Sequence, residues 1–312
     1  MIFTHTANPS IDRSVSVPKI RFNEVLRCNN ADLTLGGKAI NVSVGLHKLG
    51  DPSLALAWAG GDAGRQLENG LNHLGVQTDF IWVEEETRTN TYIKEENSEW
   101  FIRLNEQGPH ISQAAIQQML DKVQSHAFVD DIWVISGSLP QAVPPDYYRD
   151  LISILHEKSC RVFFETTGPA FDAGKLETPY FVKPELEDAE KYLGSPIKTY
   201  EDAKRSALAF LRSGIQYVAL QLEKSEVLLA SQSEIVLANL PGSEPVNDHG
   251  ITGAIMAGIV HGFANGLTIQ EAARWSAAFG NAVIRKGGMP QVELGDVQNL
   301  LPKVDVRLFN VM

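Results

Sequence analysis

In the stretch Ile132-Trp133-Val134-Ile135-Ser136-Gly137-Ser138-Leu139-Pro140, four consecutive apolar residues run directly into a loop of small residues and proline. A short apolar run bounded by turn residues is typical of a strand that is buried on both faces. The flanking segments 112–125 and 146–158 have patterns typical of helices. Because buried strands alternate here with helices, the sequence predicts an α/β fold with a mostly parallel sheet covered on both faces.

The same alternation extends in both directions along the chain. The predicted strands cover 1–6, 54–59, 80–83, 132–135, 161–165, 180–183 and 217–222, and 227–230 with 235–238 is expected to be an antiparallel edge pair. In such sheets ligands bind beyond the carboxyl ends of the strands. Ser138, Thr166, Lys183 and Gly250 follow strand ends or lie in loops on that side, so we expect them to cluster. No repeat or linker interrupts the chain, and we expect residues 1–312 to form one domain with a lid.

The lid is predicted as a small sheet formed by two segments, about 12–33 and 87–107. The strands expected in it are 15–17, 24–29, 87–91 and 100–105, the last two joined by the polar turn 95–98. These segments alternate polar and apolar residues or flank a turn in a hairpin pattern. Because a monomer would leave the apolar residues of this sheet exposed, the sequence also predicts a homodimer held through the lid.

Two glycine-containing stretches precede predicted helices. Gly36-Gly37-Lys38 lets the backbone approach a ligand, offers a point charge for phosphate, and is followed by Asn41 in the first helical turn. Taken alone, a surface lysine after a turn is the commoner explanation. In Asp248-His249-Gly250-Ile251-Thr252-Gly253, free backbone N–H groups at a helix start form an anion site. Taken alone, an ordinary core helix capped by Asp248 is the simpler interpretation.

The composition argues against several classes of function. A formal net charge of −11 disfavours nucleic acid or an anionic membrane surface as the main partner. Cys28 and Cys160 have no metal-ligand spacing and are too few for a disulfide framework. Residues 1–9 lack the basic and apolar regions of a signal peptide, and the apolar segment 251–267 is interrupted by polar residues. We therefore expect a soluble, cytoplasmic protein.

A series of motifs along the whole chain resembles the PfkB (ribokinase-like) sugar kinases, and within them the 1-phosphofructokinase and tagatose-6-phosphate kinase branch. The motifs are Asn8-Pro9-Ser10-Ile11-Asp12, Gly36-Gly37-Lys38-Ala39-Ile40-Asn41-Val42-Ser43, Gly60-Gly61, Thr87-Arg88-Thr89-Asn90, Leu104-Asn105-Glu106-Gln107-Gly108-Pro109, Ile135-Ser136-Gly137-Ser138-Leu139-Pro140 and Lys183-Pro184. The resemblance implies a ribokinase-like three-layer sandwich whose β-sheet lid often clasps a second subunit. It also implies transfer of the γ-phosphoryl group of Mg-ATP to a ketohexose phosphate, such as fructose 1-phosphate or tagatose 6-phosphate.

The resemblance also implies an acceptor site, which these motifs retain. Its residues would be Asp12, Gly37, Lys38, Asn41, Arg88, Asn90 and Ser138. Asp12 would bind sugar hydroxyls, and Lys38 and Asn41 would bind the sugar or its phosphate. Arg88 and Asn90 would reach the ligand from the lid, above Ser138 at the floor. Considered without the family, Arg88 is as readily an exposed arginine on a sheet face.

The donor site departs from the family pattern. The family has Gly-Ala-Gly-Asp, whose amides form an anion hole and whose Asp removes the acceptor proton. This chain has Gly250-Ile251-Thr252-Gly253, so Gly253 stands at the base position. The remaining nucleotide-side positions are Lys183, Glu185, Glu223, Glu226, Phe279 and Asn281, with Asp188 as a doubtful ligand for Mg²⁺. Glu223 and Glu226 replace two glycines of the nucleotide loop, and Phe279 stands where small residues usually line the adenine pocket.

These departures have large expected effects. Loss of a general base typically lowers the rate by about 10²–10⁴, and a damaged anion hole by roughly another 10²–10³. A carboxylate about 4 Å from a phosphate charge repels it by roughly 4 kcal/mol at an effective dielectric constant of 20. Asp248 or His249 is a candidate substitute base, although a capping aspartate and an exposed loop histidine are the simpler interpretation.

Two hypotheses remain open from the sequence. The first is a phosphosugar kinase that uses Mg²⁺ and ATP with unconventional donor chemistry. The second is a non-catalytic sugar-phosphate-binding sensor or regulatory protein that needs neither. Because the base, anion hole, nucleotide loop and metal motif all change while the acceptor motifs are kept, the sequence favours strongly reduced or lost catalysis.

Overall fold

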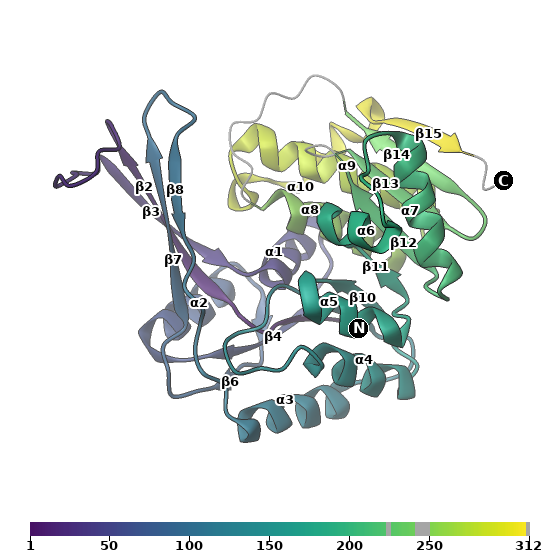
Figure 1. The fold of residues 1–312 in the computed structure, drawn as a ribbon, viewed down its shortest axis with the longest axis horizontal. Coiled ribbons are helices and arrows are strands. Elements are labelled where there is room, and N and C mark those ends of the chain that lie inside the picture. The colour runs from purple at the N-terminus through teal and green to yellow at the C-terminus, as the bar shows by residue number, and fades with distance from the viewer. Residues whose placement is uncertain (223–225, 241–249, 310–312) are drawn as a thin grey trace.

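The computed structural model describes residues 1–222, 226–240 and 250–309, and its centre is a large, mostly parallel sheet (Figure 1). The strands run in the order β15-β14-β13-β12-β11-β10-β9-β1-β4-β5, with β6 also pairing with β4. Their bounds are β1 (Ile2–Thr6), β4 (Leu54–Ala59), β5 (Gln77–Thr78), β6 (Ile81–Trp82), β9 (Ile132–Ser136), β10 (Arg161–Glu165), β11 (Phe181–Val182), β12 (Tyr217–Gln221), β13 (Val227–Ser231), β14 (Ile235–Asn239) and β15 (Asp305–Phe309). The predicted sheet is therefore confirmed, with parallel pairing from β5 to β12.

One edge of this sheet differs from the prediction. The pair β13–β14 is antiparallel as expected, but β14 also pairs with β15 through the register Leu237↔Arg307. The predicted edge pair is therefore internal to the sheet. Residues 305–309 were not predicted as a strand, because most of this short segment is exposed and it has no buried apolar run.

Helices cover both faces of the sheet, and each face has its own hydrophobic core. On one face lie α1 (Lys38–Leu49), α2 (Gly61–His73), α8 (Ile251–Ala264), α9 (Ile269–Lys286) and α10 (Leu294–Gln298). On the other lie α3 (Gln113–His126), α4 (Tyr147–Glu157), α5 (Gly168–Gly174), α6 (Leu186–Leu193) and α7 (Tyr200–Arg212). The neighbours Phe163 and Phe164 on β10 enter opposite cores, as the two-residue period of a strand requires. The three-layer sandwich is thus confirmed.

The lid is a separate four-stranded sheet that projects from the main body (Figure 1). Its strands β2 (Ser10–Val17), β3 (Asn30–Gly36), β7 (Arg88–Glu95) and β8 (Phe101–Leu104) run in the order β3-β2-β7-β8. The prediction of a strand at 24–29 was wrong, because β3 begins only at Asn30. Since β2 ends at Val17, residues 24–28 extend beyond the strand with which they would have to pair. Among the described helices, none has the length and apolar character needed to cross a bilayer.

Candidate functional site

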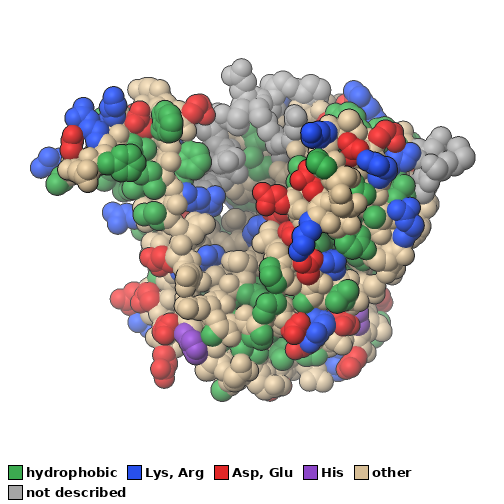
Figure 2. Space-filling view, in the orientation of Figure 1, with side chains coloured by type: hydrophobic (Ala, Val, Ile, Leu, Met, Phe, Trp, Pro, Cys, Tyr) green, Lys and Arg blue, Asp and Glu red, His purple; other side chains and the backbone are tan. Residues whose placement is uncertain are grey.

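The candidate site is a cleft of about 420 Å³ between the lid sheet and the carboxyl ends of the central strands. Figure 2 shows a hollow there, with Lys and Arg side chains on the lid side and Asp and Glu side chains on the facing rim. The predicted residues that line the cleft are Asp12, Gly37, Lys38, Asn41, Arg88, Asn90, Ser138, Thr166, Gly250, Thr252 and Gly253. The structure therefore brings together the residues predicted for the acceptor site.

Asp12 and Asn90 face each other across the pairing of β2 with β7. Asn90 Nδ2 donates to Asp12 Oδ1 at 2.7 Å, and Ser10 Oγ donates to the same oxygen at 2.8 Å. A side chain at Gly36 on β3 would collide with this group, because its Cβ would lie 2.5 Å from Asp12 Oδ2. Both hydrogen bonds end on Oδ1, so they orient the carboxylate without using Oδ2, which can accept from a ligand hydroxyl.

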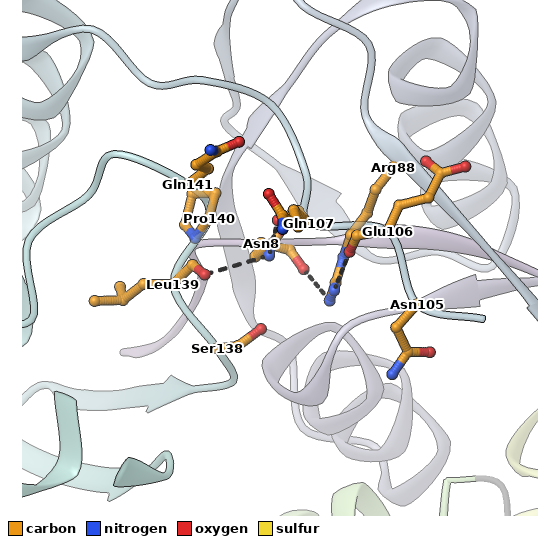
Figure 3. Close-up of a pocket in the computed structure, with 9 residues that line it drawn as sticks. All are labelled: Asn8, Arg88, Asn105, Glu106, Gln107, Ser138, Leu139, Pro140 and Gln141. Atoms are coloured by element: carbon orange, nitrogen blue, oxygen red, sulfur yellow. Dashed lines mark hydrogen bonds between the residues drawn. The ribbon is translucent and has the colours of Figure 1, made fainter. Parts of the chain in front are cut away.

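Arg88 lies at the base of the lid, where its guanidinium is held by the main chain (Figure 3). Nη2 donates to the Asn8 carbonyl at 2.8 Å, and Nη1 donates to the Glu106 carbonyl at 3.2 Å. Burial lowers the pKa of Arg88 from its ordinary value, but an arginine stays charged at neutral pH. Arg88 also borders a second pocket of about 480 Å³, beside Ser138 and Leu139 (Figure 3). These two contacts hold the guanidinium in position, and both acceptors are main-chain carbonyls, not carboxylates.

Arg103 also lines the cleft, although it was not among the predicted site residues. It lies on β8 opposite Tyr92 of β7. Alternate residues of a strand share a face, so Arg88, Asn90 and Tyr92 point the same way, and Arg103 joins them across the hairpin. The hairpin pattern was recognised, so extending it to a residue-by-residue register would have found this second lid arginine.

Lys38 is the first residue of α1 and meets carboxylates from the opposite side of the cleft. Its Nζ donates to Glu185 Oε1 and lies 3.8 Å from Glu165 Oε1. Burial alone would lower the pKa of Lys38, but the charges of Glu165 and Glu185 outweigh it and raise the pKa. Burial would raise the pKa of Glu185, whereas Lys183 and Lys38 lower it overall. Both partners of this ion pair are therefore charged at neutral pH.

Glu165 and Lys183 form a buried ion pair next to Lys38. Lys183 Nζ donates to Glu165 Oε1 at 2.8 Å, and Ser136 Oγ donates to Oε2 at 2.9 Å. The side chains of Glu165 and Lys183 are 0% and 1% exposed. Lys183, predicted on the nucleotide side, therefore lies beneath the cleft rather than in its lining. Glu165 escaped the sequence analysis, although a carboxylate at the end of a buried strand is a usable signal.

Gly253 lies in the first turn of α8, pressed against α1. A Cβ added to Gly253 would lie 2.5 Å from the Cβ of Asn41, well inside contact distance. One turn further along, a Cβ added to Gly45 of α1 would lie 2.7 Å from the Cβ of Ala257 on α8. Each helix thus provides one glycine that receives a side chain of the other. The space that the first carbon of an acid at position 253 would need is occupied by Asn41.

The remaining donor-side residues also make contacts within the protein. Glu226 is buried and accepts hydrogen bonds from Tyr200 Oη and Asn239 Nδ2, both at 3.0 Å. Asp188 accepts from the Gly168 amide at 3.1 Å. Phe279, Asn281 and Ile251 are buried, and Asn281 Nδ2 donates to the Ala277 carbonyl. Glu223, Asp248 and His249 lie outside the described residues.

Two carboxylates predicted for the nucleotide and metal side are engaged within the protein. A magnesium site needs carboxylate oxygens that are free to face the metal and the phosphates. Glu185 faces Lys38, and Asp188 accepts from a backbone amide. Within residues 1–222, 226–240 and 250–309, no three His, Cys, Asp or Glu side chains are grouped so that they could hold a metal ion.

An α/β sandwich with a large, mostly parallel sheet and a smaller separate sheet is the ribokinase-like fold of the carbohydrate kinases. The sequence profile of the pfkB family carbohydrate kinases matches residues 4–291, and the chain belongs to this family. The resemblance inferred from the motifs is therefore confirmed.

Individual relatives match nearly the whole chain. The chain is 29% identical over 306 residues to a 1-phosphofructokinase of Bacillus subtilis, covering 98% of this chain and 99% of the relative. It is 26% identical to a 1-phosphofructokinase of Borreliella burgdorferi, with 98% of each chain covered. The fold matches the structure of phosphofructokinase-2 from Escherichia coli in complex with substrates and products with a TM-score of 0.91, at 24% identity and over 96% and 98% of the two chains.

Proposed function

We propose that this protein binds a hexose phosphate in the cleft beneath the lid and has lost most or all of its phosphotransfer activity. The observation that carries the proposal is the contact between Gly253 and Asn41. The base position has no side chain, and the Cβ of Asn41 occupies the space that one would need. A sugar kinase without this base lacks the group that removes the proton from the acceptor hydroxyl.

The acceptor side supports binding. Asp12 is oriented by two hydrogen bonds and keeps Oδ2 for a sugar hydroxyl, while Asn41 and Ser138 line the same space. Arg88 and Arg103 supply two positive charges on the lid side, which suit a phosphate group. The relatives named 1-phosphofructokinase make fructose 1-phosphate the first ligand to test, with tagatose 6-phosphate second.

A pair of calorimetric titrations tests this proposal on the full-length protein. The first uses fructose 1-phosphate, fructose 6-phosphate and tagatose 6-phosphate, and the second uses Mg-ATP. We expect saturable binding of at least one hexose phosphate and no measurable binding of Mg-ATP at millimolar concentration. Lys38→Ala should weaken sugar-phosphate binding at least tenfold, whereas the exposed Lys303→Ala should not. No binding of any hexose phosphate would remove the proposal.

We also propose that the protein is a homodimer clasped through the lid. The exposed apolar side chains of the lid sheet and its loops are Phe22, Val25, Leu33, Trp100, Phe101 and Leu104. Several exposed apolar side chains on a small projecting sheet are typical of a contact between subunits. Light scattering should give twice the chain mass. Phe101→Lys combined with Leu104→Lys should give a monomer, whereas Leu176→Lys, at a site 70% exposed on the main body, should leave the mass unchanged.

A further inference from the structure

On the lid side of the cleft, two arginines form no ion pair with a described carboxylate. Arg88 and Arg103 both line it there. The two hydrogen-bond acceptors of Arg88, the carbonyls of Asn8 and Glu106, are neutral main-chain groups. The carboxylates of Asp12 and Glu106 act on Arg88 without a direct contact; Asp12 Oδ1 accepts from Ser10 and Asn90, and Glu106 Oε2 accepts from the Thr89 amide. A phosphate group placed beside the two arginines can therefore pair directly with guanidinium groups that form no ion pair with a described carboxylate.

The side of the cleft facing the lid has a different charge balance. Lys38 contacts Glu185 and lies 3.8 Å from Glu165, and Lys183 lies 2.8 Å from the same Glu165 oxygen. Two lysines and two glutamates cancel one another. The Glu185 side chain is 40% exposed and contacts Lys38, which lines the cleft, so its carboxylate lies next to the ligand space, whereas Glu165 is buried. A second phosphate group that approached Lys38 would meet a lysine whose charge is already neutralised.

We propose that Glu185 makes the cleft selective for hexose monophosphates over hexose bisphosphates. This inference rests on the proposed function, because it concerns the ligand of the same site. A monophosphate can place its phosphate beside Arg88 and Arg103 and its hydroxyls beside Asp12 and Lys38. With the first phosphate beside the lid arginines, the second phosphate of a bisphosphate has Lys38 as the remaining cation among the described residues that line the cleft. Contact with Lys38 Nζ would bring it within roughly 6 Å of the Glu185 carboxylate, where like charges repel strongly.

One feature of the cleft opposes this selectivity. The first-turn amides of α8, at Gly250 to Gly253, attract anions whichever group supplies them. They are partial charges, whereas Glu185 carries a full negative charge and also neutralises the lysine that would act together with them. The pKa of Glu185 lies below its ordinary value, so the repulsion persists throughout the neutral range. The balance therefore favours rejection of the second phosphate.

Calorimetry with matched ligands tests the inference. The full-length protein is titrated with fructose 6-phosphate and with fructose 1,6-bisphosphate, in EDTA so that no divalent cation screens the phosphates. We expect the bisphosphate to bind at least tenfold more weakly. In Glu185→Gln this ratio should shrink at least about fivefold, chiefly through tighter bisphosphate binding. Glu187→Gln is the matched control, because it removes the same charge from an exposed position in the first turn of α6, which Glu185 caps, and should leave the ratio unchanged.

The outcomes separate the inference from the proposed function. If the unmodified protein binds both ligands equally, or binds the bisphosphate more tightly, the inference is wrong while the proposed function stands. A ratio that is the same in Glu185→Gln and Glu187→Gln would also overturn it. If neither ligand binds, and the wider hexose phosphate panel also fails, both proposals fall together. Thermal melting of Glu185→Gln and of a second variant, Glu185→Asn, shows whether either substitution destabilises the fold.

Discussion

The two sides of the cleft use their polar side chains in different ways. On the lid side, hydrogen bonds orient Asp12 and Arg88 and leave a carboxylate oxygen and a positive charge directed at the ligand space. On the donor side, Lys183, Glu185 and Glu226 satisfy partners within the protein. Binding a ligand needs groups that are held in position but not neutralised. The difference supports the proposal that the cleft recognises a sugar phosphate and does not use a nucleotide.

The largest expected effect concerns phosphotransfer, and it tests whether the donor side has lost its function. Starting from a typical turnover of about 10 s⁻¹, loss of the base and damage to the anion hole predict a rate on the order of 10⁻³ to 10⁻⁶ s⁻¹. We expect Gly253→Asp alone to recover little, because its Cβ collides with Asn41 and the donor-side carboxylates remain. Combining it with Ile251→Ala, Thr252→Gly, Glu223→Gly and Glu226→Gly should give transfer that is measurable in a coupled assay but, because the collision with Asn41 remains, well below ordinary turnover.

The opposite result would assign the base elsewhere. If the unmodified protein phosphorylates a hexose phosphate at ordinary rates, the donor side is functional despite its substitutions. Loss of that turnover in Asp248→Ala or His249→Ala, but not in the exposed Glu187→Gln, would identify the new base. The comparison between the two sides would then be wrong for catalysis.

A smaller effect concerns the core beneath the acceptor loops, where burial lowers the pKa of His5 to about 4. Between about pH 6.5 and pH 4 the unfolded chain therefore binds a proton that the folded chain does not, so acidification destabilises the fold. The free energy of unfolding should fall by about 3 kcal/mol across this pH range, at about 1.4 kcal/mol per pKa unit. Urea titrations at several pH values would measure it. In His5→Gln the free energy of unfolding should lose this part of its pH dependence. An unchanged pH dependence would show that His5 is not its cause.

The smallest effect concerns the contact of α1 with α8, and it tests through protein stability whether Asn41 fills the space at position 253. Gly→Ala inside a helix normally stabilises by about 1 kcal/mol. At Gly253 the added Cβ meets Asn41, so overpacking of about 1–3 kcal/mol should reverse the sign. Gly295→Ala, where the added Cβ meets nothing within 4 Å, is the control. Urea denaturation should show Gly253→Ala destabilised and partly relieved by Asn41→Gly, and a stabilised single variant would contradict the packing argument.

The alternation of buried strands and helices was predictable from the sequence, because apolar periodicity is a property of neighbouring residues. Strand β10 was predicted with its observed bounds, Arg161–Glu165, and the acceptor residues were found from their motifs. Strand β15 escaped prediction because an exposed edge strand carries little periodic signal. Arg103 escaped because its position depends on the register of β7 with β8.

The sequence by itself determined the family, the sandwich and the absence of an acid at position 253. The ion pairs of the cleft, and the side chain that fills the space at position 253, could be seen only in the tertiary structure. Lys38 and Glu185 are 147 residues apart and belong to different motifs, so no local pattern links them. Asn41 and Gly253 likewise meet only because α1 and α8 pack against each other on one face of the sheet. Electrostatic pairing and steric exclusion act through space, and their partners are set by the packing of elements far apart in the chain.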